Sequence, residues 1–107
     1  MPKLHLKCVD GKHIEYRKPP EDYWESGHWP LTEEEADRLV GGTVMLHETK
    51  KKLSYFGGEV IGFHPSVAAD GYPGRFVLHI RSKAECKGLP WRGRNDVNAW
   101  FGGLLDD

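Results

Sequence analysis

The stretch TVMLHETKKKLSYFGGEVIGF, residues 43–63, contains two apolar runs on either side of a short polar segment. The runs TVMLHE and LSYFGGEVIGF are typical of β-strands, and ETKKK is typical of the turn that joins two strands. Gly57, Gly58 and Gly62 lie inside the second run, where glycines often mark a bulge, a bend or the close approach of another backbone. The stretch therefore predicts two neighbouring strands, the second bent enough for a small sheet to curl towards a barrel.

The residues just before this stretch, LTEEEADRLVGG at 31–42, predict a short helix over residues 33–40. Thr32 is a suitable N-cap residue, and Glu35 three positions later completes a capping box. The glutamate run suits the positive end of the helix dipole, and the Gly-Gly pair ends the helix. Because the glutamates have this structural explanation, no catalytic role is inferred from them.

The N-terminal residues show the alternation of a half-buried strand. In KLHLKCV, residues 3–9, the two leucines and the cysteine share one face, whereas His5 lies on the other. The DG pair at 10–11 favours a tight turn, so a hairpin with KHIEYR, residues 12–17, is expected. The next segment, KPPEDYWESGHWP at 18–30, is expected to be a loop because its proline pair ends the strand.

Aromatic residues are frequent in that predicted loop, which contains Tyr23, Trp24 and Trp29. One interpretation is that these rings cover one end of the core, since large rings bury much apolar area. The alternative is that they form a recognition surface, although exposed aromatic residues are less common than buried ones.

Together these elements predict a single α+β domain over residues 1–107. One more strand is expected at RFVLHIR, residues 75–81, and a second short helix near residues 96–101. The sheet is expected to be small, curled and mostly antiparallel, or a partly open barrel, with one or two short helices. The predicted core consists of apolar residues from these elements: Leu4, Leu6, Ile14, Leu39, Val44, Leu46, Val60, Ile61, Val77, Leu78 and Ile80.

The composition is that of a globular protein, with 38% hydrophobic and 29% charged residues. No apolar run is long enough to span a bilayer, and the N-terminus lacks the apolar core of a secretory signal. We therefore expect a cytoplasmic protein without a membrane partner. In that compartment Cys8 and Cys86 are expected to be reduced and buried.

Enzymatic motifs are not found in the chain. There is no GxSxG nucleophile elbow, no phosphate-binding GxxxxGK[ST] loop and no GxGxxG fingerprint. Lys83 and Lys87 flank Cys86 and would lower the pKa of its thiol if they lay close to it. This single feature does not favour an enzyme, so no catalytic residue and no cofactor is expected.

Six histidines raise the question of a metal site. Their spacing matches no zinc-binding motif, so no metal site is expected from the sequence. One arrangement would create such a site: His47, His64 and His79 lie on or beside three predicted strands and could converge in the fold. The alternative is that each histidine packs singly.

Positive charge is concentrated after residue 48. Residues 1–48 carry six Lys or Arg and ten Asp or Glu, whereas residues 49–107 carry nine and six. Cations that alternate with aromatic rings are typical of surfaces for single-stranded nucleic acid, because cations contact phosphates and rings stack on bases. The alternative is a solvated lysine turn that only keeps a sheet edge soluble. The candidate nucleic-acid-binding residues are Lys50, Lys51, Lys52, Tyr55, Trp91, Arg92 and Arg94.

The helix, the following strand that ends in LHE, and the strand with GG and EVIGF resemble the small PUA-like β-barrels, including the ASCH and EVE-type domains. The resemblance covers residues 30–82. In those folds a helix precedes the barrel strands, and a cleft between helix and barrel receives RNA or a modified base. The resemblance implies a cleft near Trp24, Trp29, His47, Glu48, Tyr55 and Gly58.

His47 and Glu48 are consecutive on a predicted strand, so their side chains point to opposite faces. His47 shares a face with Met45, and Glu48 shares the other with Leu46. At most one of the two can line the cleft, and a joint acid–base pair is not expected.

Two functions remain open from the sequence. The first is a small intracellular module that binds RNA, single-stranded nucleic acid or a nucleotide in a cleft beside the barrel. The second is a protein-interaction or inhibitor domain of the phage or mobile-element type, which would not bind nucleic acid. The sequence does not predict the oligomeric state.

Overall fold

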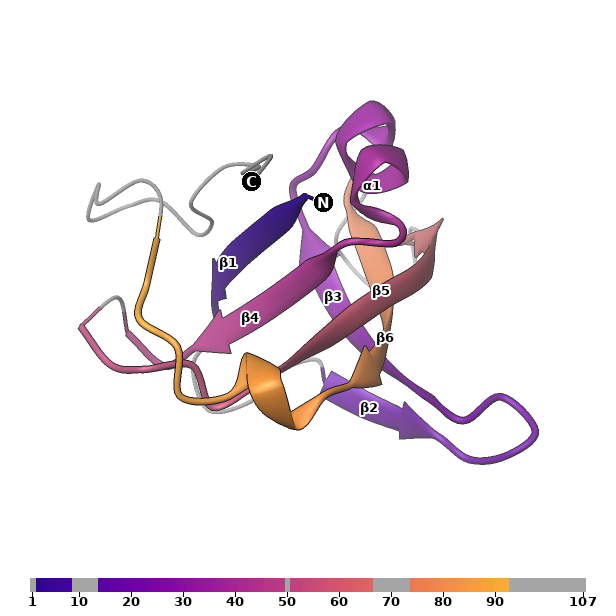
Figure 1. Cartoon of the computed structure of the whole chain (residues 1–107). Coiled ribbons are helices and arrows are strands. Elements are labelled where there is room, and N and C mark those ends of the chain that lie inside the picture. Colours follow the sequence, from indigo (N-terminus) through magenta and orange to yellow (C-terminus); the bar gives the residue numbers. More distant parts are fainter. Residues whose placement is uncertain (1, 9–13, 50, 67–73, 93–107) are drawn as a thin grey trace.

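One six-stranded sheet forms most of the protein (Figure 1). The structure is a computed structural model, and it describes residues 2–8, 14–49, 51–66 and 74–92. The strands are β1 (Lys3–Lys7), β2 (Ile14–Arg17), β3 (Tyr23–Trp29), β4 (Thr43–His47), β5 (Phe56–Pro65) and β6 (Phe76–Ser82). A helix, α1 (Glu33–Leu39), precedes β4, and a short 3-10 helix, η3 (Ala84–Cys86), follows β6.

The strands are arranged in the order β1-β4-β5-β6-β3-β2. All neighbouring pairs are antiparallel except β1 and β4, which run parallel. The sheet curls but does not close, so that β1 and β2 form its two edges (Figure 1). The prediction of a small, curled and mostly antiparallel sheet is confirmed in this form, with α1 at one end of the sheet.

The central strand pair follows the prediction from residues 43–63. β4 and β5 are antiparallel, with Val44 opposite Gly58 and Met45 opposite Gly57. A Cβ atom at Gly58 would collide with the backbone oxygen of Arg81, so only glycine fits where β6 comes this close. The register between β5 and β6 shifts after Val60, and this irregularity marks the expected bend.

The predicted N-terminal hairpin is wrong. β1 runs parallel to β4, with Leu4 beside Val44 and Leu6 beside Leu46, and β2 pairs with β3 instead. The physical reason is burial: all four side chains are fully enclosed, so this pairing extends the apolar face of the sheet. The DG turn itself lies outside the described residues.

The loop predicted over residues 18–30 is also wrong, because most of it forms β3. The proline pair ends β2 as expected, but the chain turns back at once, and the Tyr16 hydroxyl donates to Asp22 across the turn (2.5 Å). Trp29 is buried and its indole N–H donates to Ser26 Oγ (3.1 Å). Trp24 packs against the core from the same face. These two tryptophans are therefore part of the core.

α1 confirms the predicted helix and its capping box. The Glu35 N–H donates to Thr32 Oγ1 (3.1 Å), and the Thr32 N–H donates to the Glu35 carboxylate (2.9 Å). Ala36 and Leu39 are fully buried against the sheet. In the part of the chain that the structure describes, no helix is long and apolar enough to cross a membrane. The second predicted helix, near residues 96–101, lies outside that part.

The core lies between the concave face of the sheet and α1. Nine of the predicted core residues are buried, but Ile14 and Ile61 are only partly buried. Ile14 belongs to the edge strand β2, and Ile61 lies at the register shift of β5. Cys8 and Cys86 are both buried, as expected. The buried predicted residues of the core are Leu4, Leu6, Leu39, Val44, Leu46, Val60, Leu78 and Ile80, and Val77 is buried outside the core cluster.

Candidate functional site

Two histidine pairs lie on the face of the sheet opposite the core. His5 Nδ1 is 2.7 Å from His47 Nε2, where β1 meets β4. His64 Nδ1 is 2.6 Å from His79 Nε2, where β5 meets β6. The expectation that each histidine packs singly is therefore wrong for these four. His47 does not join His64 and His79, because its ring contacts His5.

The His5–His47 pair is buried, with exposed fractions of 1% and 0%. His47 Nδ1 is 3.0 Å from the Lys52 carbonyl oxygen, which can only accept, so Nδ1 carries the proton. Burial lowers the pKa of His47, although the hydrogen bond to Lys52 acts in the opposite direction. Trp91 packs on both rings, with centroids 5.9 Å from His5 and 5.1 Å from His47. The pair thus holds the β4–β5 turn through the Lys52 carbonyl oxygen and provides the surface on which Trp91 packs.

Ser54 connects the β4–β5 turn to the segment after η3. Its Oγ donates to the Cys86 carbonyl oxygen (2.6 Å) and accepts from the Leu89 N–H (3.0 Å). Its N–H donates to the Leu89 oxygen (2.8 Å), and its carbonyl oxygen accepts from the Gly88 N–H (2.7 Å). These four hydrogen bonds hold residues 86–89 against the turn, and Figure 1 shows the orange segment passing beside it.

This attachment brings two separate parts of the predicted nucleic-acid surface together. Lys51 and Lys52 are exposed on the turn, whereas Trp91 is partly exposed and Arg92 is exposed at the end of the attached segment. Lys87 is exposed on the same segment. We call these five residues the cationic rim. Of the other candidates, Lys50 and Arg94 lie outside the described residues.

Tyr55 is also adjacent to this surface, but it serves the core. Its ring is partly buried against the core cluster, and its hydroxyl donates to the Cys8 carbonyl oxygen (2.6 Å). Leu53 lies two residues before Tyr55 and is 58% exposed. Leu89 lies on the attached segment and is 36% exposed. Exposed apolar side chains therefore lie next to the cationic rim.

The residues of the implied cleft are mostly enclosed by the protein itself. Trp29 and His47 are buried, and Gly58 is buried against the backbone of β6. Trp24 is partly buried, with its ring edge-on to Phe56 at 5.4 Å. Glu48 is partly exposed at the end of β4. The structure brings His47 and Glu48 to the turn, but it places Trp24 and Trp29 in the core.

The surroundings of Cys86 disfavour the thiolate, which is the reactive form of the side chain. Burial raises the pKa of its thiol, Glu85 raises it further, and Lys83 opposes both effects. The Cys86 carbonyl oxygen is used by Ser54, so this segment has a structural role.

A second polar cluster occupies the outer face across β3, β5 and β6. Glu25 lies directly opposite His79, and His64 reaches the same position from β5. One ligand atom from each of these three residues lies within 4.8 Å of the others. Arg17 holds both carboxylate oxygens of Glu25, at 3.1 Å each, and Tyr23 stacks on the His79 ring at 4.4 Å.

His79 is electrostatically different from an exposed histidine. Burial lowers its pKa, the neighbouring His64 lowers it further, and Arg17 adds a smaller effect in the same direction. Glu25 opposes these effects through its negative charge. The neutral ring, which can offer a lone pair, is therefore favoured.

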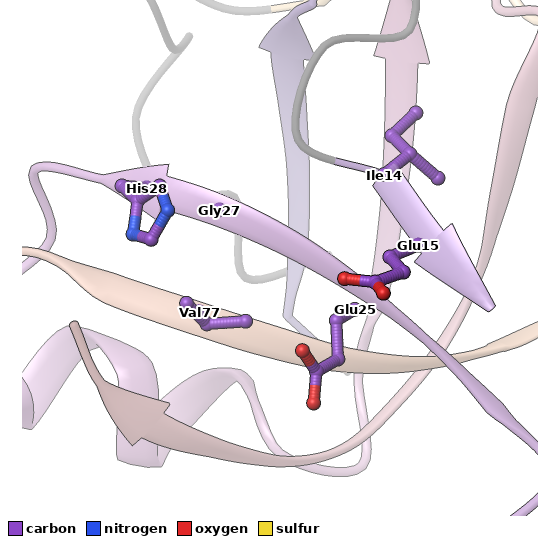
Figure 2. A pocket seen from close by; sticks show the side chains of 6 residues that line it. All are labelled: Ile14, Glu15, Glu25, Gly27, His28 and Val77. Carbon is purple, nitrogen blue, oxygen red and sulfur yellow. The ribbon is translucent and has the colours of Figure 1, made fainter. Parts of the chain in front are cut away.

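An open pocket of about 250 Å³ lies next to this cluster (Figure 2). Figure 2 shows the carboxylates of Glu15 and Glu25 at one end and His28 at the other. His28 Nδ1 and Ser66 Oγ share a hydrogen bond of 2.6 Å. With two carboxylates in its wall, the pocket suits a cation or a hydrogen-bond donor better than a phosphate. Its lining residues are Ile14, Glu15, Glu25, Gly27, His28 and Val77.

Sequence reasoning missed Glu25 and Ser54. Glu25 falls within the loop predicted over residues 18–30. If the segment YWESGHW is treated as a strand, its alternation puts Glu25 on the face opposite Trp24. Ser54 shows no local signal, because its partners lie more than thirty residues away in the chain.

No family model, curated protein or solved structure significantly matches this chain. The PUA-like resemblance therefore stays a prediction.

Proposed function

We propose that this protein is a small binding module for single-stranded nucleic acid, which it contacts through the cationic rim. The observation that carries the proposal is the attachment at Ser54, which holds the segment leading to Trp91 and Arg92 against the turn that carries Lys51 and Lys52. Exposed ammonium and guanidinium groups attract phosphates, and an indole ring offers a stacking surface to any base.

The position of Trp91 supports this proposal. Its ring rests on His5 and His47 while remaining partly exposed. A ring that is already held in place loses little conformational entropy when a base stacks on it. Few cations and one ring favour weak binding with little base specificity, because phosphate contacts carry no sequence information.

The acidic residues on the β2–β3 side of the sheet support the choice of the cationic rim as the binding surface. Glu15 and Glu25 line the pocket there and none of its lining residues is Lys or Arg, so the pocket suits a phosphate less well than the cationic rim does. The protein has a net charge of only −1, which means that the distribution of charge matters more than its sum. The bent sheet with its preceding helix is also compatible with a PUA-like module, and that assignment is part of this proposal.

A second candidate function is protein interaction or inhibition, as in domains of the phage or mobile-element type. It is favoured by Leu53 and Leu89, two exposed leucines next to the cations. Exposed apolar side chains in a polar surrounding mark interaction surfaces in many proteins.

Fluorescence anisotropy with labelled RNA, single-stranded DNA and duplex DNA at two salt concentrations separates the two functions. Phosphate binding weakens log-linearly with salt, whereas an apolar protein interface has no such requirement. Lys52→Ala should weaken binding and lower the salt slope by about one unit, and Lys18→Ala, an exposed lysine on the β2–β3 turn, should change neither. Absence of binding to all three probes at low salt would reject the nucleic-acid proposal.

A further inference from the structure

We propose that Glu25, His64 and His79 bind one divalent transition-metal ion, of the class of Zn²⁺ or Co²⁺. Two imidazole nitrogens and one carboxylate are a donor set that these ions take in proteins. The three ligand atoms already lie within 4.8 Å of one another, although the residues come from three different strands. This inference is independent of nucleic-acid binding, because none of these residues belongs to the cationic rim.

The distances between the histidines fit an ion that replaces a shared proton. His64 Nδ1 and His79 Nε2 face each other at 2.6 Å, so one of them donates a hydrogen to the other. On an ion with bonds of about 2.1 Å, two such nitrogens stand about 3.0–3.4 Å apart. The rings therefore need to separate by less than about 1 Å and to turn so that both lone pairs point at the ion.

Metal binding does not change the number of protons that the neutral histidine pair carries. In the neutral pair one of the facing nitrogens carries a hydrogen, and that nitrogen must lose it to coordinate the ion. The same ring can take a proton at its other nitrogen, so the neutral pair binds metal without a net release of protons.

The three side chains are held in position by the sheet. Glu25 is paired with His79 in the β3–β6 ladder, and Tyr23 stacks on the His79 ring at an angle of 21°. Gly62 lies opposite His79 on β5, and even a Cβ atom there would stay 3.6 Å from His79 Nδ1. Three protein ligands leave a fourth position for water on a four-coordinate ion, and sites of this kind are typical of a reactive metal centre rather than a structural one.

The surrounding charge favours a cation. Glu15 on β2 lies directly opposite Glu25 on β3, so two carboxylates face the same region (Figure 2). Arg17 is the competing group, since it bonds to both oxygens of Glu25. The ion must share or displace this guanidinium, and removal of Arg17 should therefore tighten metal binding.

The other histidine pair provides an internal comparison. His5 and His47 have nearly the same nitrogen separation, 2.7 Å, but His47 is fully buried and its Nδ1 already donates to Lys52. That pair has no open position for water. Of the two pairs, His64 and His79 are therefore the one that suits a metal ion.

The test uses the full chain without an affinity tag, stripped of metal with a chelator. Isothermal titration with Zn²⁺ should show one ion per chain, and Co²⁺ should produce a visible absorption band of a nitrogen- and oxygen-ligated ion. Glu25→Gln, His64→Gln and His79→Gln should each weaken binding at least about tenfold. His28→Gln removes a neighbouring pocket histidine and should leave the affinity unchanged.

Arg17→Gln, in contrast to the ligand variants, should increase the Zn²⁺ affinity several-fold. A general loss of structure would not produce such an increase. Circular dichroism identifies any variant that fails to fold, and Glu25→Gln and Arg17→Gln, which alter only the partly exposed outer face, then carry the test. The proposal is overturned if the parent binds neither ion, if His79→Gln binds as tightly as His28→Gln, or if Arg17→Gln binds no more tightly than the parent. Lys52→Ala should not change metal affinity, so this result is distinguishable from the nucleic-acid test.

Discussion

Ser54 and Leu89 are joined by two hydrogen bonds, one from the Ser54 N–H to the Leu89 oxygen (2.8 Å) and one from the Leu89 N–H to Ser54 Oγ (3.0 Å). The β4–β5 turn and the segment after η3 are therefore one structural unit, although they are far apart in the chain. The side chain of a single buried serine supplies much of this connection.

Replacement of that side chain should loosen the unit. Ser54→Ala removes the bond to the Cys86 carbonyl oxygen and leaves the Leu89 N–H without its hydroxyl acceptor. Urea unfolding should show a loss on the order of 1–3 kcal/mol, the usual penalty for a buried hydrogen-bond partner that is removed. Ser54→Thr, which keeps the hydroxyl, serves as the control. Equal stability of Ser54→Ala and the parent would contradict this role.

The lysine turn can be tested as a whole. Replacement of Lys50, Lys51 and Lys52 together by alanine should leave the fold intact, because Lys51 and Lys52 are exposed. The salt slope of nucleic-acid binding should decrease by up to about three units, one for each lost phosphate contact. If the triple variant binds as the parent does at every salt concentration, the lysines only make the turn soluble.

Leu46 should be among the most sensitive core positions. It is fully buried on β4 between Leu6 of β1 and Phe56 of β5. Leu46→Ala should lower the free energy of unfolding by on the order of 2–5 kcal/mol, since it removes apolar contacts and leaves a cavity. Leu53→Ala is a matched control with the same chemical change at a side chain that is 58% exposed, and it should be nearly neutral.

The stability should fall in mild acid, in part because of His47. Its pKa is lowered from 6.5 in the folded protein, so the unfolded chain binds a proton more readily than the folded one. The contribution of neutral His47 is thus complete above pH 6.5 and is lost as the pH falls below that value. The ring faces His5, the Lys52 carbonyl oxygen and Trp91.

Urea unfolding of the parent at pH 7.5 and 5.5 should therefore give a lower free energy at pH 5.5. His47→Gln should be less stable than the parent at pH 7.5 but should lose less on acidification. The pKa of His79 is lowered as well, so the difference between the two proteins, not the fall in either one, measures His47. An identical pH dependence in both would show that His47 does not titrate in this range.

The elements that sequence patterns predicted well are those whose signals are local. Thr32 and Glu35 define the start of α1 through their own spacing, and the glycines of β5 mark a strand that neighbours approach closely. The partner of β1 could not be found in this way. The DG turn favoured β2, but the burial of Leu6 beside Leu46 decides the pairing, and that depends on the whole sheet.

The candidate sites show the same division. The lysine turn was evident from the sequence, because a charged run between two strands is a local pattern. The approach of Trp91 to that turn and of Glu25 to His79 required the registers of strands distant in the chain. From the sequence, no metal site is expected, and the one arrangement that would create it joins His64 and His79 to His47, whose ring contacts His5 instead.

The parallel pairing of β1 with β4 has a consequence for how the chain folds. Lys3 pairs with Thr43, so about 40 residues, including β2, β3 and α1, must be made before the first strand can find its place. Closing a loop of this length costs entropy before any contact repays it, and such non-local pairing slows folding. During synthesis β1 therefore leaves the ribosome well before β4 and must wait for β4 to emerge before the two strands can pair.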